Sequence, residues 1–328
     1  MKKFTLAAVA ALAFSAAPAF AADMPVKAVK AAAPPAWDVA FGSAIASDYI
    51  WRGITQSNHK PSVAAYFEPR YNINKDMQLY VGLGGASIDF PNRAAAEIDV
   101  YAGFRPTFGK FAFDFGVWYY WYPGGQCFNV NVPTCSPSGG VAPISLPNGN
   151  VAKADWSFYE IFGKVNYSVT DQLTLGAFVY YSPNVLNTGA EGVFFGGNAK
   201  YTFPAMANGM QWYVSGEAGY WDLGTSDAFY GCSVALGCLA NNPAGIPYAS
   251  YTTWNVGFGW TYKVFTLDLR YIDTDLSKAE CNAFTSDHTA VFNASGVTSI
   301  NAGPLSNWCG ARFVARLSAD LTVNTNLK

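Results

Sequence analysis

Residues 96–122 read AEIDVYAGFRPTFGKFAFDFGVWYYWY, two alternating runs around a short turn at Gly109–Lys110. Apolar side chains occupy every second position, beginning at Ile98 in the first run and at Phe111 in the second. Alternation with a period of two predicts strands rather than a helix. Each run has about ten to thirteen residues, against about five or six for a globular strand, and this is the length of a tilted strand that crosses a bilayer. The stretch therefore predicts a transmembrane β-hairpin.

The two faces of this hairpin differ in chemistry. The apolar face is expected to meet lipid, because exposing a charge at the middle of a bilayer costs about 2–4 kcal/mol. The opposite face carries Glu97, Asp99, Arg105 and Asp114, which we expect to point into the interior. The second run ends in the aromatic segment 118–122, which is typical of the interfacial girdle of membrane barrels.

The rest of the chain repeats this unit, with connections that alternate between short turns and long loops. The sequence thus predicts an all-β fold, a transmembrane antiparallel up-and-down β-barrel of about 12 strands with short periplasmic turns and long outer loops. An even strand count places both termini at the periplasmic rim. The predicted strands are 36–51, 62–73, 76–88, 96–107, 110–122, 154–168, 171–182, 192–203, 210–222, 250–262, 264–274 and 308–320. The predicted long loops are 52–61, 89–95, 123–153, 183–191, 223–249 and 275–307.

Charged residues within these runs fall on the face opposite the apolar one. We predict that they line a lumen, since a small soluble barrel would have its apolar residues inside and its polar residues outside. The balance of acidic and basic residues predicts no strong ion selectivity, and it fits either a narrow hydrated channel or a barrel closed by ion pairs. The pore-lining candidates are Glu68, Arg70, Glu97, Asp99, Arg105, Asp114, Glu160, Lys164, Lys200, Glu217, Asp268, Arg270, Arg312 and Arg316.

The start of the chain is typical of an exported bacterial protein. A basic start and an apolar segment precede an A-x-A cleavage site at 19–21, so residues 1–21 are predicted to be a signal peptide. Residues 22–35, rich in Ala, Pro and Lys, are expected to form a periplasmic lead-in. Residues 36–328 are expected to form the barrel in the bacterial outer membrane.

Composition favours the same class of protein. Charged residues make up 13% of the chain, against about 25% in ordinary globular proteins. Loss of two lysines with the signal peptide leaves 18 basic and 22 acidic residues, a net charge of −4, which is too balanced to predict a nucleic-acid partner. The expected partners are outer-membrane lipid and small hydrophilic solutes. No cofactor, metal site or catalytic residue is predicted, and the oligomeric state is left open.

Six cysteines form three local pairs, each in or at the edge of one of the three longest predicted loops. Six cysteines allow fifteen connectivities, and pairing in sequence order is favoured because each pair lies in one long segment between strands. Metal binding is the rival interpretation, but none of the spacings is C-x-x-C. We predict the disulfides Cys127–Cys135, Cys232–Cys238 and Cys281–Cys309, which require an oxidising compartment.

Residues 47–69, SDYIWRGITQSNHKPSVAAYFEP, carry a distinctive set of residues before an alternating strand, namely Asp48-Tyr49, Arg52-Gly53, Gln56-Ser57 and Pro61. This pattern resembles the motif of the TorF family of porin-like bacterial outer-membrane proteins, most densely over 37–120. The resemblance implies an outer-membrane barrel and little about chemistry. Asp48 and Arg52 are expected to share a face of the first strand. They would form either a polar pair that ties the first loop to the barrel mouth or a rim ion pair in a constriction.

The titratable residues allow three chemical alternatives to a pore. A hydrolase barrel needs a Ser–His pair at its lipid-facing wall, but His59 and His288 both fall in predicted loops. Asp99 and Asp114 are predicted to face each other across their hairpin, where two carboxylates could serve acid–base chemistry. Loop acids could bind calcium, and these are Asp222, Asp227, Asp273, Asp275 and Asp287.

The predicted function is therefore not enzymatic. It is a porin-like outer-membrane channel for the passive diffusion of small hydrophilic solutes. The alternative is a closed barrel that presents disulfide-pinned surface loops, with a role in adhesion, as a receptor or in envelope integrity.

Overall fold

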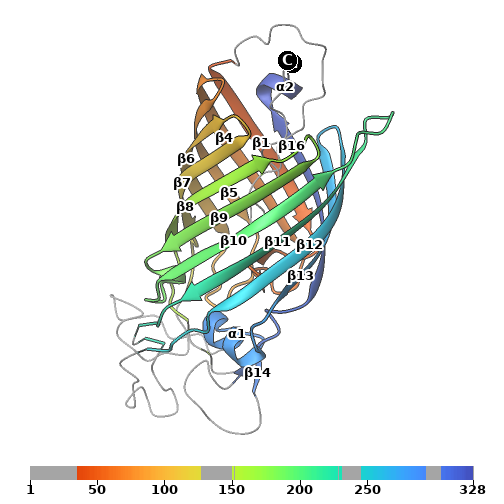
Figure 1. Ribbon diagram of the computed structural model, residues 1–328. Coiled ribbons are helices and arrows are strands. Elements are labelled where there is room, and N and C mark those ends of the chain that lie inside the picture. The colour runs from red at the N-terminus through yellow and green to blue at the C-terminus, as the bar shows by residue number, and fades with distance from the viewer. Residues whose placement is uncertain are drawn as a thin grey trace.

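The computed structural model describes residues 35–126, 150, 152–227, 229–230, 245–292 and 304–327. In these residues twelve antiparallel strands form one closed barrel, as predicted, and pairing of the first strand with the last closes the ring (Figure 1). The barrel strands are β1 (Trp37–Ala46), β4 (Ser62–Asn74), β5 (Met77–Ala86), β6 (Glu97–Phe108), β7 (Phe111–Trp121), β8 (Phe158–Ser168), β9 (Leu173–Ser182), β10 (Gly192–Thr202), β11 (Gln211–Leu223), β12 (Tyr251–Tyr262), β13 (Phe265–Thr274) and β16 (Arg312–Thr322).

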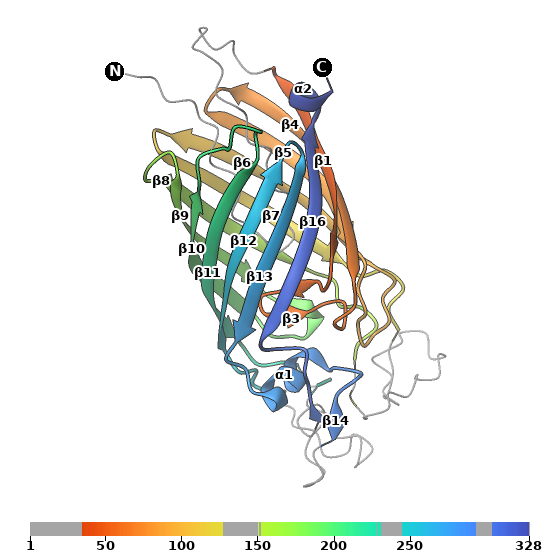
Figure 2. The ribbon, with the colours of Figure 1, turned by 90° about the vertical axis from the view of Figure 1, so that its right-hand side faces the viewer.

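Short turns lie at one end of the barrel and long loops at the other (Figures 1 and 2). The start of β1 and the C-terminal helix α2 (Val323–Asn326) lie at the short-turn end, which agrees with the predicted even count. The long loops carry the helices η2 (Val185–Asn187) and α1 (Lys278–Thr285) and the strands β14 (Val291–Phe292) and β15 (Pro304–Leu305). Within the described part of the chain, no helix combines the length and the hydropathy that a membrane span requires.

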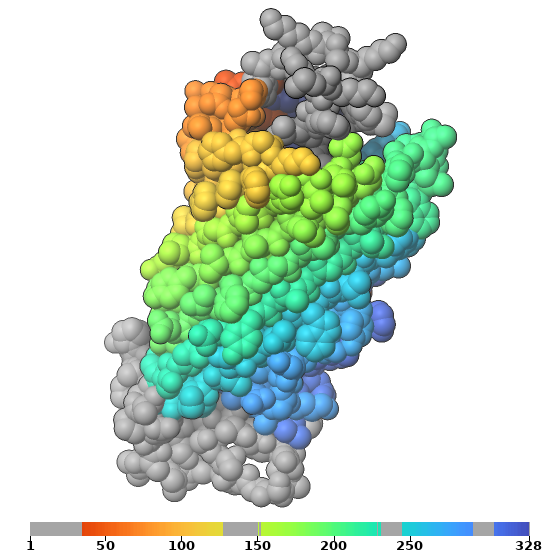
Figure 3. Space-filling model, viewed as in Figure 1, coloured from red at the N-terminus to blue at the C-terminus, as the bar shows by residue number. Residues whose placement is uncertain are grey.

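Side chains alternate between the two faces of the wall as the sequence predicts. Val100 and Phe115 are 48% and 49% exposed on the outside, whereas Tyr101 and Trp118 are 3% and 7% exposed on the inside. The tilted strands form a continuous outer wall on the side seen in the space-filling view (Figure 3). Large apolar side chains are spread over this outer face on all twelve described strands of the ring. Such a surface suits lipid, because a hydrocarbon environment excludes outward charges.

The first and last strands differ from their predicted bounds. β1 ends at Ala46 rather than at residue 51, because residues 47–61 turn into the barrel. We call residues 47–61 the inward hairpin; it contains the short strands β2 (Ile50–Trp51) and β3 (Ile54–Thr55) (Figure 2). β16 begins at Arg312 rather than at residue 308, since the segment before it pairs with the inward hairpin instead of with the barrel.

The aromatic end of the 96–122 hairpin is divided between the two faces of the wall. Tyr119 and Trp121 point outward, as a girdle requires, but Trp118, Tyr120 and Tyr122 are almost fully buried inside the barrel. Alternation continues to the end of the strand, so consecutive aromatic residues cannot share one face. The prediction of a single interfacial girdle over 118–122 is therefore wrong for three of these five residues. The inward ones join a layer of rings that fills the long-loop half of the barrel.

Candidate functional site

The inward hairpin crosses the bore of the barrel. Its tip residues Arg52 and Gly53 have φ values of +49° and +81°, and two successive positive φ values are typical of a type I′ turn. A Cβ at Gly53 would lie 2.7 Å from Oγ1 of Thr253, so only glycine allows the tip to lie this close to β12. The hydroxyl of Tyr251 donates to the carbonyl oxygen of Arg52 at 2.9 Å. The tip is thus held against β12, three strands from β1 around the ring.

A buried ion pair fastens the tip. Nη1 and Nη2 of Arg52 donate to Oε1 and Oε2 of Glu160 on β8, each at 2.8 Å. Both side chains are 1% exposed. Tyr120 on β7 adds a hydrogen bond from its hydroxyl to Oε2 of Glu160 at 3.2 Å. A bidentate pair of this geometry is strong and directional, so it places the hairpin in one position across the bore.

Four aromatic rings surround the Arg52 guanidinium. Its Cζ lies 4.4 Å from the ring centroids of Trp51, Phe194 and Trp221, and 5.1 Å from that of Tyr180. Trp51 also packs edge-on against Trp221, with ring centroids 4.9 Å apart. We call these four rings and Glu160 the Arg52 cage. Cation–π attraction is strengthened where water is excluded, as it is in this cage.

Asp48 holds the base of the inward hairpin and does not pair with Arg52. Its Oδ1 accepts hydrogen bonds from the hydroxyls of Thr55 at 2.6 Å and Ser57 at 2.9 Å, and its Oδ2 lies 3.1 Å from Nδ1 of His59. The expectation that Asp48 and Arg52 share a face of the first strand is wrong, because that strand ends before either residue. The two charges instead secure the base and the tip of one hairpin.

A cavity of about 190 Å³ lies in the lumen beside the inward hairpin. It is lined by β1, β4, β5, β11, β12, β13 and β16, and it reaches Asp48, Tyr49 and Ile50 of the hairpin. Its other lining residues include Thr261 and Thr266, which flank the short turn between β12 and β13. The cavity therefore extends from the short-turn end of the barrel to the hairpin.

One lumenal charge network lies on β4, β6 and β7. Glu68 is fully buried and accepts hydrogen bonds from Nε of Arg70 at 2.6 Å and from Nη1 of Arg105 at 2.8 Å. Nε of Arg105 lies 3.4 Å from Oδ2 of Asp114, which also receives the Tyr80 hydroxyl at its Oδ1 at 2.6 Å. These predicted pore-lining residues neutralise one another along the wall.

A second network lies across the lumen on β10, β11 and β13, and it lines the cavity. Asp268 accepts a hydrogen bond from the Tyr213 hydroxyl at 2.5 Å and from Nε and Nη2 of Arg270 at 3.0 Å. Arg270 also donates to Ser215 at 2.9 Å. Nζ of Lys200 lies 4.1 Å from the centroid of the Tyr213 ring. Three more of the predicted residues line this cavity, namely Arg316, Glu217 and Asp99.

Three other predicted pore-lining residues lie inside the barrel, at the long-loop half or the middle. Glu97 accepts hydrogen bonds from the hydroxyls of Tyr49 at 2.5 Å and Tyr122 at 2.9 Å, and Asp99 accepts one from Nε1 of Trp118 at 3.0 Å. Nζ of Lys164 lies 4.5 Å from the Phe162 ring.

Two expectations about the lumenal charges are wrong. Arg312 lies at the long-loop end of β16, where its guanidinium contacts the His59 ring at 3.0–3.2 Å and the carbonyl oxygen of Asn307 at 2.6 Å. Arg312 therefore contacts loop residues instead of lining the lumen, because β16 starts at this residue. Asp99 and Asp114 do not face each other, since Asp99 is paired in register with Tyr120 and Asp114 lies beside Arg105.

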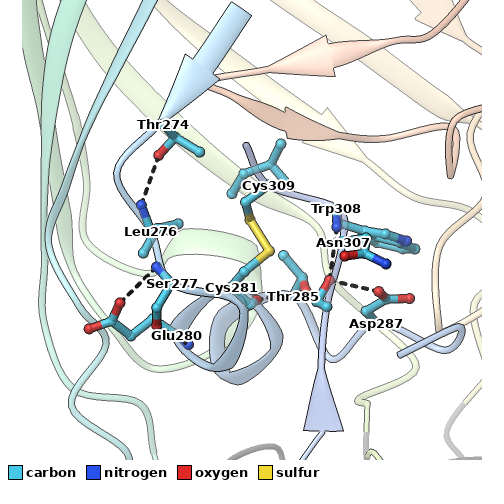
Figure 4. Close-up of a disulfide and its surroundings, with 12 residues drawn as sticks. Thr274, Leu276, Ser277, Glu280, Cys281, Thr285, Asp287, Asn307, Trp308 and Cys309 are labelled. Carbon is cyan, nitrogen blue, oxygen red and sulfur yellow. Dashed lines mark hydrogen bonds between the residues drawn. A yellow bond between two sulfur atoms is a disulfide. The ribbon is translucent and has the colours of Figure 1, made fainter. Parts of the chain in front are cut away.

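The predicted disulfide Cys281–Cys309 is formed, with its Cα atoms 5.9 Å apart (Figure 4). It joins α1 to the segment before β16, and α1 begins at a capping box between Ser277 and Glu280. Cys309 forms an isolated β-bridge with Ile54, and the amide of Thr55 donates to the carbonyl oxygen of Trp308 at 3.0 Å. The disulfide thus supports the strand segment on which the inward hairpin rests. Cys127, Cys135, Cys232 and Cys238 lie outside the described residues, as does the predicted signal peptide.

A titratable cluster covers the hairpin at the long-loop end. Asp89 accepts hydrogen bonds from Lys60 at 2.5 Å and Asn58 at 3.1 Å, and Nε2 of His288 lies 3.6 Å from it. Burial opposes ionisation of Asp89, but the Lys60 and Asn58 hydrogen bonds outweigh it and lower the pKa of this carboxyl. Burial lowers the pKa of His288, and the nearby Asp89 offsets this only in part.

The loop acids considered for calcium are engaged by donors of the protein itself. In the part of the chain that the structure describes, no group of three or more His, Cys, Asp or Glu side chains is placed to hold a metal ion. The acids and their donors are Asp222 with Ser250, Asp227 with Lys153, Asp273 with Tyr271, Asp275 with the Thr252 amide, and Asp287 with Ser306.

Sequence reasoning missed the aromatic part of the site. Tyr180, Phe194 and Trp221 occupy the inward face of β9, β10 and β11, but an alternating strand rich in apolar residues on both faces does not show which rings gather around a charge. A signal was present in the alternation itself. Phe194 and Phe195 are consecutive on one strand, so their side chains point to opposite faces of the wall and one of the two must point inward.

A closed barrel with an apolar outer face and a charged, hydrogen-bonded interior defines a class, the β-barrels that span membranes. The model of a family described as bacterial proteins of unknown function, Gcw_chp, matches residues 30–301, and the chain belongs to this family. That description neither includes the TorF name nor states a function, so the TorF assignment stays a prediction.

Solved structures resemble the chain only distantly, and none of the curated proteins matches it. An outer membrane channel from Pseudomonas putida F1 is 7% identical, with 88% of this chain and 96% of that chain covered and a TM-score of 0.39. The NanC porin is 9% identical, with 86% of this chain and 98% of that chain covered and a TM-score of 0.38. LpxR from Salmonella typhimurium is 10% identical, with 86% of this chain and 99% of that chain covered and a TM-score of 0.39. TM-scores this low transfer no function.

Proposed function

We propose that the protein is a porin-like channel of the bacterial outer membrane, which passes small hydrophilic solutes by diffusion and is closed in this state by the inward hairpin. The observation that carries the proposal is the cavity that runs from the short-turn end to the hairpin. Charged and hydroxyl side chains line it, while the opposite face of the same strands is apolar. A structural core would gain more from apolar packing than from these desolvated charges.

The proposed orientation follows from the loops. The short turns and both chain termini of the barrel face the periplasm, and the long loops with the disulfide face the outside of the cell, as in bacterial outer-membrane barrels. Solutes would then meet the inward hairpin from outside and the cavity from the periplasm. Opening requires the hairpin to leave the bore, because its tip is bound to the opposite wall.

Single-channel recording in a planar bilayer tests the proposal, with heat-modifiable gel mobility as the check that the barrel is folded. We expect rare openings in the wild type and more frequent openings when Glu160 is replaced by Gln. Lys200→Gln, which removes a cavity charge, should change the cation-to-anion permeability ratio. Lys110→Gln, a matched change at an exposed turn, should leave it unchanged.

A second candidate function is a closed barrel that presents its long loops to a partner. The bidentate Arg52–Glu160 pair favours it, because the pair locks the bore in one state. If folded Glu160→Gln protein carries no current in any recording, the channel proposal is wrong and this alternative takes its place.

A further inference from the structure

The surroundings of the Arg52 guanidinium form a built site for a cation. A carboxylate meets it edge-on with two hydrogen bonds of 2.8 Å, and four rings lie within 4.4–5.1 Å of its centre. Both charged side chains are 1% exposed. Ring faces attract a cation, and a carboxylate matches the planar fork of a guanidinium group.

Glu160 and three of the four cage rings belong to the barrel wall, whereas Trp51 and Arg52 belong to the inward hairpin. Glu160, Tyr180, Phe194 and Trp221 come from four consecutive strands, β8 to β11, that are paired in an unbroken ladder. Arg52 enters from the hairpin between β1 and β4, on the opposite side of the ring. If the hairpin moved, three of the four rings and the carboxylate would remain in place on the wall.

The docked position of Arg52 is unfavourable in two respects, one hydrogen-bond donor and the backbone conformation. Among the described residues its buried Nε has no hydrogen-bond partner, and an unmet buried donor destabilises the docked state. Its backbone has a φ of +49°, which is unfavourable for a residue other than glycine. A free cation of the same shape would bind the cage without the backbone strain.

The adjoining cavity favours cations. Its lining contains five carboxylates, Asp48, Asp99, Glu217, Asp268 and Asp320, and three basic residues, Lys200, Arg270 and Arg316. The cavity ends against the hairpin whose tip fills the cage. Rings of side-chain charge tune which ions enter a pore, so this excess of acidic groups favours delivery of cations to the cage.

We infer that the Arg52 cage is a lumenal binding site for small organic cations that carry a guanidinium group, and that Arg52 is its tethered, displaceable occupant. The inference rests on the proposed channel function, for which it names the solute class. A bound solute and a docked hairpin exclude each other, so the same solute would favour the open bore.

Binding of methylguanidinium to folded Arg52→Ala protein in detergent tests the inference without any measurement of conduction. Calorimetry should show saturable binding, and the fluorescence of the cage tryptophans should change in parallel. Adding Glu160→Gln should weaken binding at least about tenfold, since hydrogen bonds to a charged group are lost. N-methylurea, the neutral analogue of similar shape, should not bind. Binding that is absent, or equal for both compounds, would overturn the inference while leaving the channel proposal standing.

The wild type provides a second measurement that needs no variant to fold. Methylguanidinium must compete with a tethered ligand whose effective concentration is on the order of millimolar or higher. Above that range it should accelerate amide hydrogen exchange at Thr55 and Gln56 in a saturable manner, and N-methylurea at the same concentration should not. Equal effects of the two compounds, or none from either, would count against Arg52 as a displaceable occupant.

Discussion

Replacing Glu160 with Gln should release the inward hairpin. The change leaves the Arg52 guanidinium buried beside a neutral amide, whose one oxygen cannot accept both of the 2.8 Å hydrogen bonds that the carboxylate accepts between side chains that are 1% exposed. Removing one partner of a buried pair costs about 3–5 kcal/mol. Since each 1.4 kcal/mol is a factor of about ten, the ratio of undocked to docked hairpin should rise roughly a hundredfold to a few thousandfold.

Hydrogen exchange measures this ratio directly. The amide of Thr55 donates to the Trp308 carbonyl oxygen at 3.0 Å, and that of Gln56 donates to the Tyr49 carbonyl oxygen within the hairpin at 2.7 Å. An isolated two-stranded hairpin is only marginally stable in water, so we expect both amides to lose protection when the hairpin undocks. Their protection factors should fall by the same hundredfold or more in Glu160→Gln, with the barrel ladder still protected.

Glu68→Gln is the matched control for this prediction. It breaks another buried carboxylate–arginine network, in which Glu68 pairs with Arg70 on β4 and with Arg105 on β6. Exchange at Thr55 and Gln56 should not change in this variant. If Glu160→Gln leaves both amides as protected as the wild type, or if Glu68→Gln exposes them equally, then the ion pair does not hold the hairpin.

Three further predictions concern the loops and the wall. Serine at both Cys281 and Cys309 removes a link across 28 residues, worth about 3.6 kcal/mol by loop entropy. Exchange at Thr55 should rise while gel mobility still shows a folded barrel, and unchanged exchange would contradict the supporting role of the disulfide. The folded-state pKa of His288 lies below its ordinary 6.5, and that of Asp89 below its ordinary 3.8, so both groups contribute stability that is complete above the ordinary pKa values and is lost as the pH falls. Because His288 becomes protonated between about pH 7 and pH 5, proteolysis of the long loops should accelerate over this range. His288→Gln should flatten this pH dependence. Gly82→Ala would place a Cβ 2.1 Å from the ring of Tyr101 and should cost about 1–3 kcal/mol in urea unfolding, whereas Gly84→Ala, whose Cβ meets nothing closer than 3.6 Å, should cost less.

Much of the barrel could be predicted from the sequence, and the reason is local. In a strand the side chains alternate strictly, so the outward position of Val100 and Phe115 and the inward position of Glu97 and Asp114 follow from their order alone. The ring of twelve described strands follows equally, because each strand pairs with the next one along the chain. The nearest neighbours in space are thus nearest neighbours in sequence.

The inward hairpin could not be predicted in this way. Its first apolar residues, Tyr49, Ile50 and Trp51, follow the alternating first strand without a glycine or proline between them, so the sequence does not show that the chain leaves the wall at residue 47. What bends it inward is a set of partners that are far away in sequence. Glu160 is 108 positions from Arg52, and Tyr251 is 199 positions away.

The sequence by itself therefore determined the barrel, its lipid face and the set of charges that points inward, because alternation is a property of consecutive residues. Only the tertiary structure decided which of those charges meet. It paired Arg52 with Glu160 inside a cage of rings, sent Arg312 to the loops and separated Asp99 from Asp114. The physical reason is that closing a ring brings opposite walls together across the bore, and the distance across it has no counterpart in the order of residues.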